Sequence, residues 1–344
     1  MRKSALWVLG LAVLLPLCSC HRTPVEAVQI HRFDKVLFET PASQLQGKLA
    51  SVAGEYDTPL LNLQPENPEF MQMLAGFVSD STMREVYRLV DSVFGDMQPQ
   101  AQQLGEALHK VEQLCPSCRY DRVYTFVSGM FDYNMRVGCN SHELIISLDQ
   151  YVLPYLSKYN YFNTPLFLVQ QSRPEYLVAD CITAIARDHI AIPQDRDMSL
   201  LDYMISEGKA IYFAQQVLPD APDSILMRYT ADQTDWMRKN ESNVWSYFMQ
   251  NQLLYEVDYM RFHNLIDDAP KTNAFRDSSP RTTDYIGWQI VRSYMKNNKV
   301  TMEELFDETD AQTILSKSNY RPLWKVKGKN KKLKSVLTHQ RLTN

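Results

Sequence analysis

The sequence predicts an α+β protein that is mostly helical, with a small antiparallel sheet packed beside helices. Apolar residues recur at helical spacing from Pro68 to Leu114 and the period changes to two between Arg119 and Asp149. Beyond that segment the helical pattern returns until the C-terminal tail. The chain shows neither an internal repeat nor a low-complexity linker, and 45% of its residues are hydrophobic. About 300 ordered residues of this composition can bury one core, so we expect a single domain.

The N-terminus is typical of an exported lipoprotein. Arg2 and Lys3 precede an apolar run over residues 5–17, which has the length of a signal peptide and is too short to span a bilayer. The run ends in Leu-Cys-Ser-Cys, which resembles a lipobox, and Cys20 is the better lipidation site because the small residue Ser19 precedes it. The expected organisation is a signal peptide at 1–19, a lipidated tether at 20–31, one domain at 32–322 and a basic tail at 323–344.

Acyl chains hold a protein on a membrane by about 0.8 kcal/mol per buried methylene, so we expect a membrane-tethered chain. Downstream of Cys20 no segment is apolar enough to span a bilayer. The chain is therefore expected to lie in the cell envelope and to face the periplasm. The residues after the anchor, His21 to Thr23, include no acidic sorting signal, which favours the outer over the inner membrane.

The C-terminal end is strongly basic. From Ala311 to Asn344 there is no Asp or Glu, and the basic residues are Lys317, Arg321, Lys325, Lys327, Lys329, Lys331, Lys332, Lys334 and Arg341. Such a tail is expected either to contact anionic lipid headgroups or an acidic partner, or to remain a solvated end. Other envelope proteins are expected partners, and nucleic acid is not.

Cys115 and Cys118 form a CxxC motif that predicts a possible disulfide in an oxidising compartment. The motif can also be redox-active, but a thioredoxin-like site follows a strand and opens a helix. Here the order is reversed, with a helical stretch before the motif and a β-like run after it. A zinc site would need a second close pair of ligands, which is missing.

Three β-like runs, 121–129, 130–138 and 141–149, are separated by Gly129 and by a Gly-Cys-Asn turn, and predict an antiparallel meander. Ser172 with Glu175 reads as a capping box that opens the next helix, and Ser199 is expected to cap the helix that ends near Pro219. Further helical stretches are expected at 230–255, 285–298, 301–308 and 310–318.

The helix after Ser199 contains an acid on its apolar face. The core-facing stripe at helical period is Leu200, Met204, Glu207, Ile211, Ala214 and Leu218. Lys209 falls on the opposite side with Asp202 and Gln216. Burying an unpaired carboxylate is unfavourable, so we expect Glu207 to form a core ion pair. The sequence leaves its partner open among Arg173, Arg187, Arg292 and a tyrosine hydroxyl; a remnant of a ligand site is the alternative role for Glu207.

Several blocks together resemble the gliding-motility lipoprotein B (GldB) family. They are "VYTFVSG", "ELIISLDQYV", "RPEYLVADCI", "SLLDYMISEGKAIYF" with its "LPD" end, and "YIGWQIVRSYMKNN" before "SNYRP". The resemblance covers most of the chain from about Arg32 to Pro322. It implies a zincin-like layout, because members of the family resemble gluzincin metallopeptidases, and it places Glu207 where those enzymes carry their third zinc ligand.

The residues that such an enzyme needs are absent. No two of the seven histidines are four residues apart, so there is no His-Glu-x-x-His motif to hold zinc. The helix that should carry the motif has Asp180 instead, which reads as a polar residue near Tyr176 and Arg187. We therefore expect no catalytic residue, no metal and no cofactor, and a degenerate cleft that contains Asp180, Glu207 and Lys209.

The resemblance implies a non-catalytic envelope lipoprotein that acts as a component or assembly factor of machinery for gliding motility and surface-protein secretion. Two alternatives come from other classes. One is a periplasmic metal-dependent peptidase with an atypical site. The other is a lipoprotein that binds a peptide or glycan in the degenerate cleft.

Overall fold

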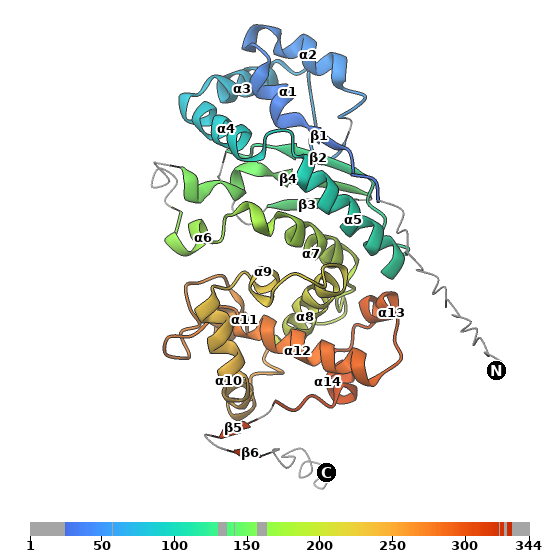
Figure 1. Cartoon of the computed structure of the whole chain (residues 1–344), viewed down its shortest axis with the longest axis vertical. Helices are drawn as coiled ribbons and strands as arrows, with labels where there is room; N and C mark the ends of the chain where they lie inside the picture. Colours follow the sequence, from blue (N-terminus) through green and yellow to red (C-terminus); the bar gives the residue numbers. More distant parts are fainter. Residues whose placement is uncertain are drawn as a thin grey trace, which may run out of the picture.

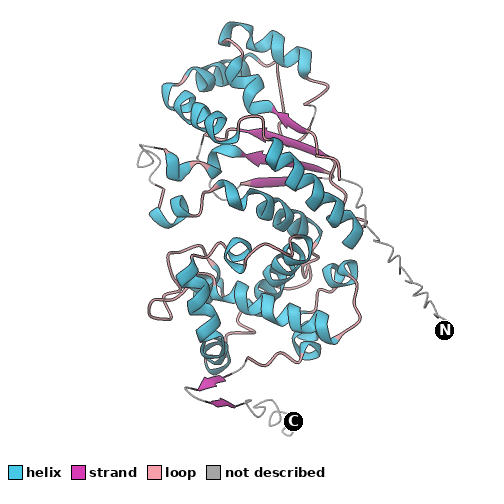
Figure 2. Ribbon diagram, in the orientation of Figure 1, coloured by secondary structure: helices cyan, strands magenta, loops and turns pink. Residues whose placement is uncertain are grey.

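A computed structural model of the chain describes residues 25–56, 58–129, 136–140, 142–156, 164–322, 324–326 and 329–331. The signal peptide and Cys20 lie outside the described residues. Figure 1 and Figure 2 show a small sheet in the N-terminal half, surrounded by helices, and below it a helical half that ends in a two-stranded hairpin. The α+β class with mostly helical content is confirmed.

The sheet has four strands in the order β1-β2-β4-β3. They are β1 (Ile30–Arg32), β2 (Arg122–Phe126), β3 (Val137–Asn140) and β4 (Glu143–Ser147). β1 runs parallel to β2 and β2 runs parallel to β4, with Val123 opposite Leu144, while β3 pairs antiparallel with β4 at the edge. The prediction of an antiparallel meander was wrong, and residues 130–135 of its second run lie outside the described part of the chain.

The burial of β4 explains the mixed topology. All five of its residues, Glu143–Ser147, are buried, as expected for a central strand covered on both faces. β4 accordingly lies between β2 and β3, in the central place that a meander would give to β3. The fourth strand, β1, begins at Ile30, inside the segment that the sequence assigns to the tether.

Five helices lie between β1 and β2, and the expected helical region 68–114 is confirmed with breaks at Asp80 and near Gly95. They are α1 (Phe33–Glu39), α2 (Leu45–Val52), α3 (Pro68–Ser79), α4 (Ser81–Phe94) and α5 (Gln98–Leu114), with a 3-10 turn η1 (Ala42–Gln44). The Asp80 carboxylate accepts from two backbone N–H groups of the first turn of α4, which satisfies donors that the helix leaves free. Directly after α5, Cys115 and Cys118 form a disulfide.

The region after β4 is helical. It comprises η2 (Leu148–Tyr151), η3 (Leu153–Tyr155), α6 (Leu166–Gln170), η5 (Pro174–Tyr176), α7 (Leu177–His189), α8 (Leu200–Val217), α9 (Asp223–Met227), α10 (Ala231–Gln250), α11 (Tyr259–Ile266), α12 (Thr282–Asn297), α13 (Met302–Asp307) and α14 (Ala311–Ser318). A hairpin of β5 (Trp324–Val326) and β6 (Lys329–Lys331) follows. No helix among the described residues has the length and apolar character that crossing a bilayer requires.

One of the two predicted helix starts is correct. Ser199 caps α8 through a complete capping box with Asp202. The capping box predicted at Ser172 is wrong, because its hydroxyl donates backward to the Leu168 carbonyl at 2.8 Å. The fixed φ of Pro174 instead starts a 3-10 turn, and α7 continues from that turn.

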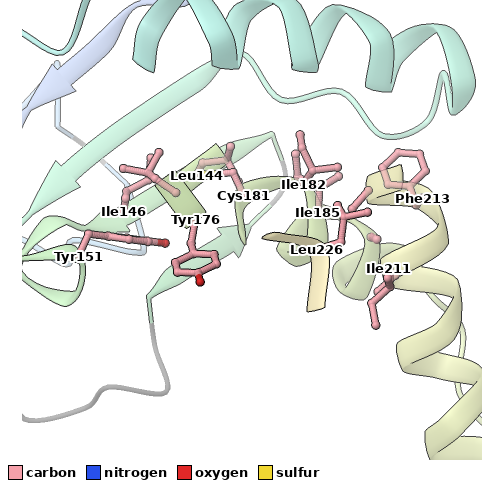
Figure 3. Close-up of a cluster of buried hydrophobic side chains, with 14 of the residues drawn as sticks. Leu144, Ile146, Tyr151, Tyr176, Cys181, Ile182, Ile185, Ile211, Phe213 and Leu226 are labelled. Atoms are coloured by element: carbon pink, nitrogen blue, oxygen red, sulfur yellow. The ribbon is translucent and has the colours of Figure 1, made fainter. Parts of the chain in front are cut away.

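An apolar cluster joins the sheet to the helical half (Figure 3). Leu144 and Ile146 of β4 face Ile182 and Ile185 of α7, and Phe213 of α8 continues the cluster on the far side. All five side chains are fully buried. Helix α7 therefore lies between the sheet and α8, and this arrangement fixes the position of the polar side chains on its remaining face.

Helices α8 and α12 pack against each other through two glycines. A Cβ placed on Gly208 would lie 2.3 Å from the carbonyl carbon of Gly287, and a Cβ on Gly287 would lie 1.7 Å from the carbonyl oxygen of Met204. Only glycine fits at either position without moving a backbone. This close approach brings the N-terminal turn of α12 next to Glu207 on α8.

Candidate functional site

Charged side chains converge where α7, α8 and the start of α12 meet. We call this set the charged junction and define it by Arg136, Asp180, Arg187, Glu207, Arg228, Asp268, Arg281 and Asp284. Asp180 and Arg187 come from α7, Glu207 from α8 and Asp284 from α12, and the other four come from connecting segments. The junction thus holds four arginines and four carboxylates.

Arg187 is the partner that the sequence left open for Glu207. The Arg187 guanidinium donates from Nε to Oε1 at 3.0 Å and from Nη2 to Oε2 at 2.6 Å, a bidentate arrangement. The other candidate arginines are engaged elsewhere, since Arg173 lies 3.7 Å from Glu175 and Arg292 stacks on Trp288. The predicted ion pair is therefore present and joins α7 to α8.

The pair lies at the surface of the core rather than inside it. The Glu207 side chain is 29% exposed and that of Arg187 is 51% exposed. Burial raises the pKa of the Glu207 carboxyl, but attraction to Arg187 and the hydrogen bonds from it outweigh this effect, and the pKa is lowered. The carboxylate therefore stays ionised at neutral pH. Because both groups are exposed to solvent, the pair contributes about 1 kcal/mol or less to stability.

Asp180 is held by a second arginine. Arg228 donates from Nε to Asp180 Oδ1 at 2.9 Å and from Nη2 to Oδ2, and the Tyr151 hydroxyl donates to Oδ2 at 2.8 Å. The remaining nitrogen of Arg228 donates to the Gln171 carbonyl at 2.6 Å, and its guanidinium lies 4.8 Å from the centre of the Tyr176 ring. Both oxygens of Asp180 therefore accept hydrogen bonds from side chains of the chain itself.

Arg281 is the third junction arginine that lies against carboxylates, in this case those of Asp268 and Asp284. Its Nε lies 2.9 Å from Asp268 Oδ1 as an ion pair outside hydrogen-bond geometry, and its Nη1 lies 3.4 Å from Asp284 Oδ2. Its Nη2 donates to the Met227 carbonyl at 2.6 Å. This arginine thus connects the start of α12 to the end of α9.

Arg228 and Arg281 both adopt a left-handed backbone conformation, with φ of +53° and +44°. Glycine or asparagine is the usual residue there, and a longer side chain costs about 1 kcal/mol or more. In both cases the conformation ends or precedes a helix and points a guanidinium into the junction. No sequence pattern marks such a position, so sequence reasoning missed both arginines.

The buried carboxyl of Asp284 is expected to make the stability of the folded chain depend on pH. Burial, opposed by Arg281 and reinforced by the nearby charge of Glu207, raises the pKa of this carboxyl to about 7. The folded state therefore keeps a proton that the unfolded chain releases near pH 4, and stability falls as pH rises between these values. Asp284→Asn should be more stable than wild type at pH 8, by about 1–2 kcal/mol, with the advantage shrinking toward pH 4. Urea denaturation across this range checks it, and an advantage independent of pH would contradict it.

Lys209, which was predicted to share a cleft with Asp180 and Glu207, does not belong to the junction. Its side chain is 2% exposed, and Nζ donates to the Glu308 carbonyl at 2.6 Å on the far side of α8. The segment after α13 that contains Glu308 covers this side of the helix, which the apolar stripe alone does not reveal. Of the three residues predicted to form the cleft, Asp180 and Glu207 both lie near Arg187. Lys209 is buried elsewhere.

Burial lowers the pKa of the Lys209 ammonium to about 8. The charged form is therefore less favourable in the folded state, and wild-type stability should rise between pH 8 and the unfolded value of 10.5. Lys209→Met removes the charge at similar volume, and we expect a gain of about 1–2 kcal/mol at pH 7 after the lost hydrogen bond is subtracted. Denaturation at pH 7 and pH 10 checks this, because the gain should shrink at the higher pH. A loss of stability at pH 7 would contradict the assignment.

Within the described part of the chain, no three His, Cys, Asp or Glu side chains converge as metal ligands do. The acids of the junction are bound by guanidinium groups instead. His142, whose local sequence starts like a zinc motif, lies in the turn before β4 and approaches the Arg119 carbonyl at 2.5 Å through Nδ1. The paired arginines and carboxylates of the charged junction can hold helices together, and guanidinium groups can bind anions.

The fold and the junction define a mostly helical α+β protein with paired charges where α7, α8 and α12 meet. Residues 20–322 match the family described as "Gliding motility protein GldB", so the chain belongs to this family. No curated protein and no solved structure matches the chain. The likeness to zinc peptidases therefore stays a prediction.

Proposed function

We propose that the chain is a non-catalytic cell-envelope lipoprotein that serves as a component or assembly factor of machinery for gliding motility and surface-protein secretion. The observation that carries this proposal is the family match, which extends over residues 20–322 and so includes the lipidation site and the whole helical region. A protein with this role acts through surfaces that bind partners rather than through a reacting group.

The charged junction supports the non-catalytic part of the proposal. A zinc peptidase needs acids and imidazoles free to bind an ion, and a general base free to take a proton from water. Here Glu207 is held bidentately by Arg187, and Asp180 is held by Arg228 and Tyr151. An arginine stays protonated at any physiological pH, so these acids remain paired.

The proposed location is the periplasmic side of the outer membrane, with Cys20 as the lipid anchor. Residues 21–24 separate that anchor from the first described residue. At the other end, we propose that the basic residues Lys325, Lys327, Lys329, Lys331, Lys332 and Lys334 contact an anionic surface. The side chains of this tail lie outside the described residues.

A complementation experiment in the host tests the proposal. The gene is deleted and restored as wild type, as Cys20→Ala, as Glu207→Gln or without residues 323–344, and surface spreading and the secretion of surface proteins are measured. Deletion should abolish at least one of these outputs, and Cys20→Ala should fail to restore it although the protein accumulates. Glu207→Gln should restore it, because the acid has no chemical step to perform. Normal spreading and secretion in the deletion strain would contradict the proposal.

A further inference from the structure

Arg136 is the junction arginine that has no carboxylate partner. It directly precedes β3, and its backbone carbonyl accepts from the Ser147 N–H at 2.9 Å, which fixes it beside the C-terminal end of β4. The guanidinium lies close enough to Arg228 and Asp180 to sense both charges. Arg136 therefore faces the same junction as the paired arginines and comes from the sheet side.

The Arg136 guanidinium is unsatisfied among the residues that the structure describes. Its Nε and Nη2 are both shielded from solvent and neither has a hydrogen-bond partner. Burial and the positive charge of Arg228 lower its pKa, but a guanidinium stays protonated in proteins. Buried donors of this kind are rare in native proteins, and each needs an explanation such as a bound ion or ligand.

The two free donors have a specific geometry. Nε and Nη2 lie on one edge of the planar guanidinium, and their N–H bonds run parallel, as the two oxygens of a carboxylate require. The same edge of Arg187 binds Glu207 in this structure through Nε and Nη2. Arg136 therefore offers the same pair of donors as the Arg187 edge that binds the Glu207 carboxylate.

The surroundings favour a singly charged ligand with an amide group. Asp180 and Asp268 attract Arg136 and would repel a second negative charge, so a monoanionic carboxylate fits better than a phosphate dianion. Gln171, whose carbonyl binds the neighbouring Arg228, has a buried Oε1 without a donor. That oxygen can accept from an amide N–H.

We propose that Arg136 binds the free C-terminal carboxylate of a peptide, with Gln171 accepting an N–H of the same peptide. Gln171 binds Arg228 through its backbone carbonyl, and Arg228 adds positive charge beside Arg136 while its own guanidinium holds Asp180. Arg136 as a residue is partly exposed, although Nε and Nη2 themselves are shielded from solvent. The inference does not depend on the role in motility.

The test uses the mature chain from Cys20 in detergent and an N-acetylated trialanine with either a free or an amidated C-terminus. Calorimetric titration should show binding of the free acid only. Arg136→Met should weaken it at least tenfold, as expected for the loss of a bidentate charged contact. Arg136→Lys keeps the charge but lacks the paired donors, and it should also lose most of the affinity. The matched control is Arg88→Met, which removes an exposed arginine on α4 and should leave binding unchanged.

The proposal also predicts the behaviour of the ligand-free variant. Because Arg136→Met removes an unpaired buried charge, its melting temperature should equal or exceed that of wild type. Equal binding of the amidated peptide would overturn the carboxylate assignment. Binding of inorganic phosphate through Arg136 in place of the peptide, or peptide binding that survives both Arg136 variants, would overturn it as well.

Discussion

Gly287→Ala is expected to destabilise the folded chain by at least about 3 kcal/mol, more than a usual overpacked core substitution. The added methyl group would lie 1.7 Å from the Met204 carbonyl oxygen, so the obstacle is backbone and not a flexible side chain. Relief requires α8 and α12 to separate, which opens the core around both helices. Gly208→Ala should act in the same way, because its methyl group meets the Gly287 backbone. Urea denaturation of the purified mature chain measures both effects.

Gly76→Ala is the matched control for these two substitutions. Gly76 lies in the middle of α3, and a Cβ there has no neighbour within 4 Å. Alanine favours the helix over glycine by about 0.5–1 kcal/mol, so this variant should be neutral or slightly more stable than wild type. If Gly287→Ala unfolds no more easily than Gly76→Ala, the close packing of α8 on α12 is wrong.

Arg228→Met is the second substitution for which we expect a large effect, a loss of about 3–5 kcal/mol. The change leaves Asp180 partly buried without its cation and leaves the Gln171 carbonyl without its donor. Adding Asp180→Asn should recover at least about 1 kcal/mol, because the uncompensated charge is then gone and the Tyr151 hydroxyl can still donate. Thermal melting of wild type, Arg228→Met, Asp180→Asn and the double variant gives the interaction energy.

The Arg238 and Asp223 pair serves as the control for the buried one. Its side chains are 53% and 27% exposed, and Nη2 of the arginine lies 2.7 Å from the carboxylate. Pairs of this kind contribute less than about 1 kcal/mol, so Arg238→Met should have a small effect. Similar losses for Arg228→Met and Arg238→Met would show that the charged junction does not hold α7 to the segment after α9.

The helices were predictable because their signals are local. The Ser199 capping box and the end of its helix near Pro219 depend on neighbouring residues only, and both are present. The sheet topology was not predictable in the same way, because the pairing of β2 with β4 joins residues far apart in sequence. One usable signal existed, since the apolar run of Leu144, Ile145 and Ile146 in β4 is typical of a central strand rather than of an edge strand.

The candidate site was predictable only in part. An acid on an apolar stripe correctly indicated that Glu207 needs a cation, but the choice of Arg187 depends on how α7 crosses α8. Arg228 and Arg281 reach the junction from left-handed turns, and Arg136 reaches it from an edge strand. Lys209 lies outside the junction because its ammonium binds the Glu308 carbonyl, a contact between residues far apart in sequence that helical periodicity does not show.

The account depends most on one claim, that the acids of the charged junction serve arginines and not a metal ion. The direct test is elemental analysis of the mature chain purified from the envelope without chelators, with Glu207→Gln prepared in parallel. We expect neither protein to carry a transition metal at a stoichiometry near one per chain. One zinc ion per wild-type chain that is absent from Glu207→Gln would contradict the claim and would establish the metal-dependent peptidase as the better description.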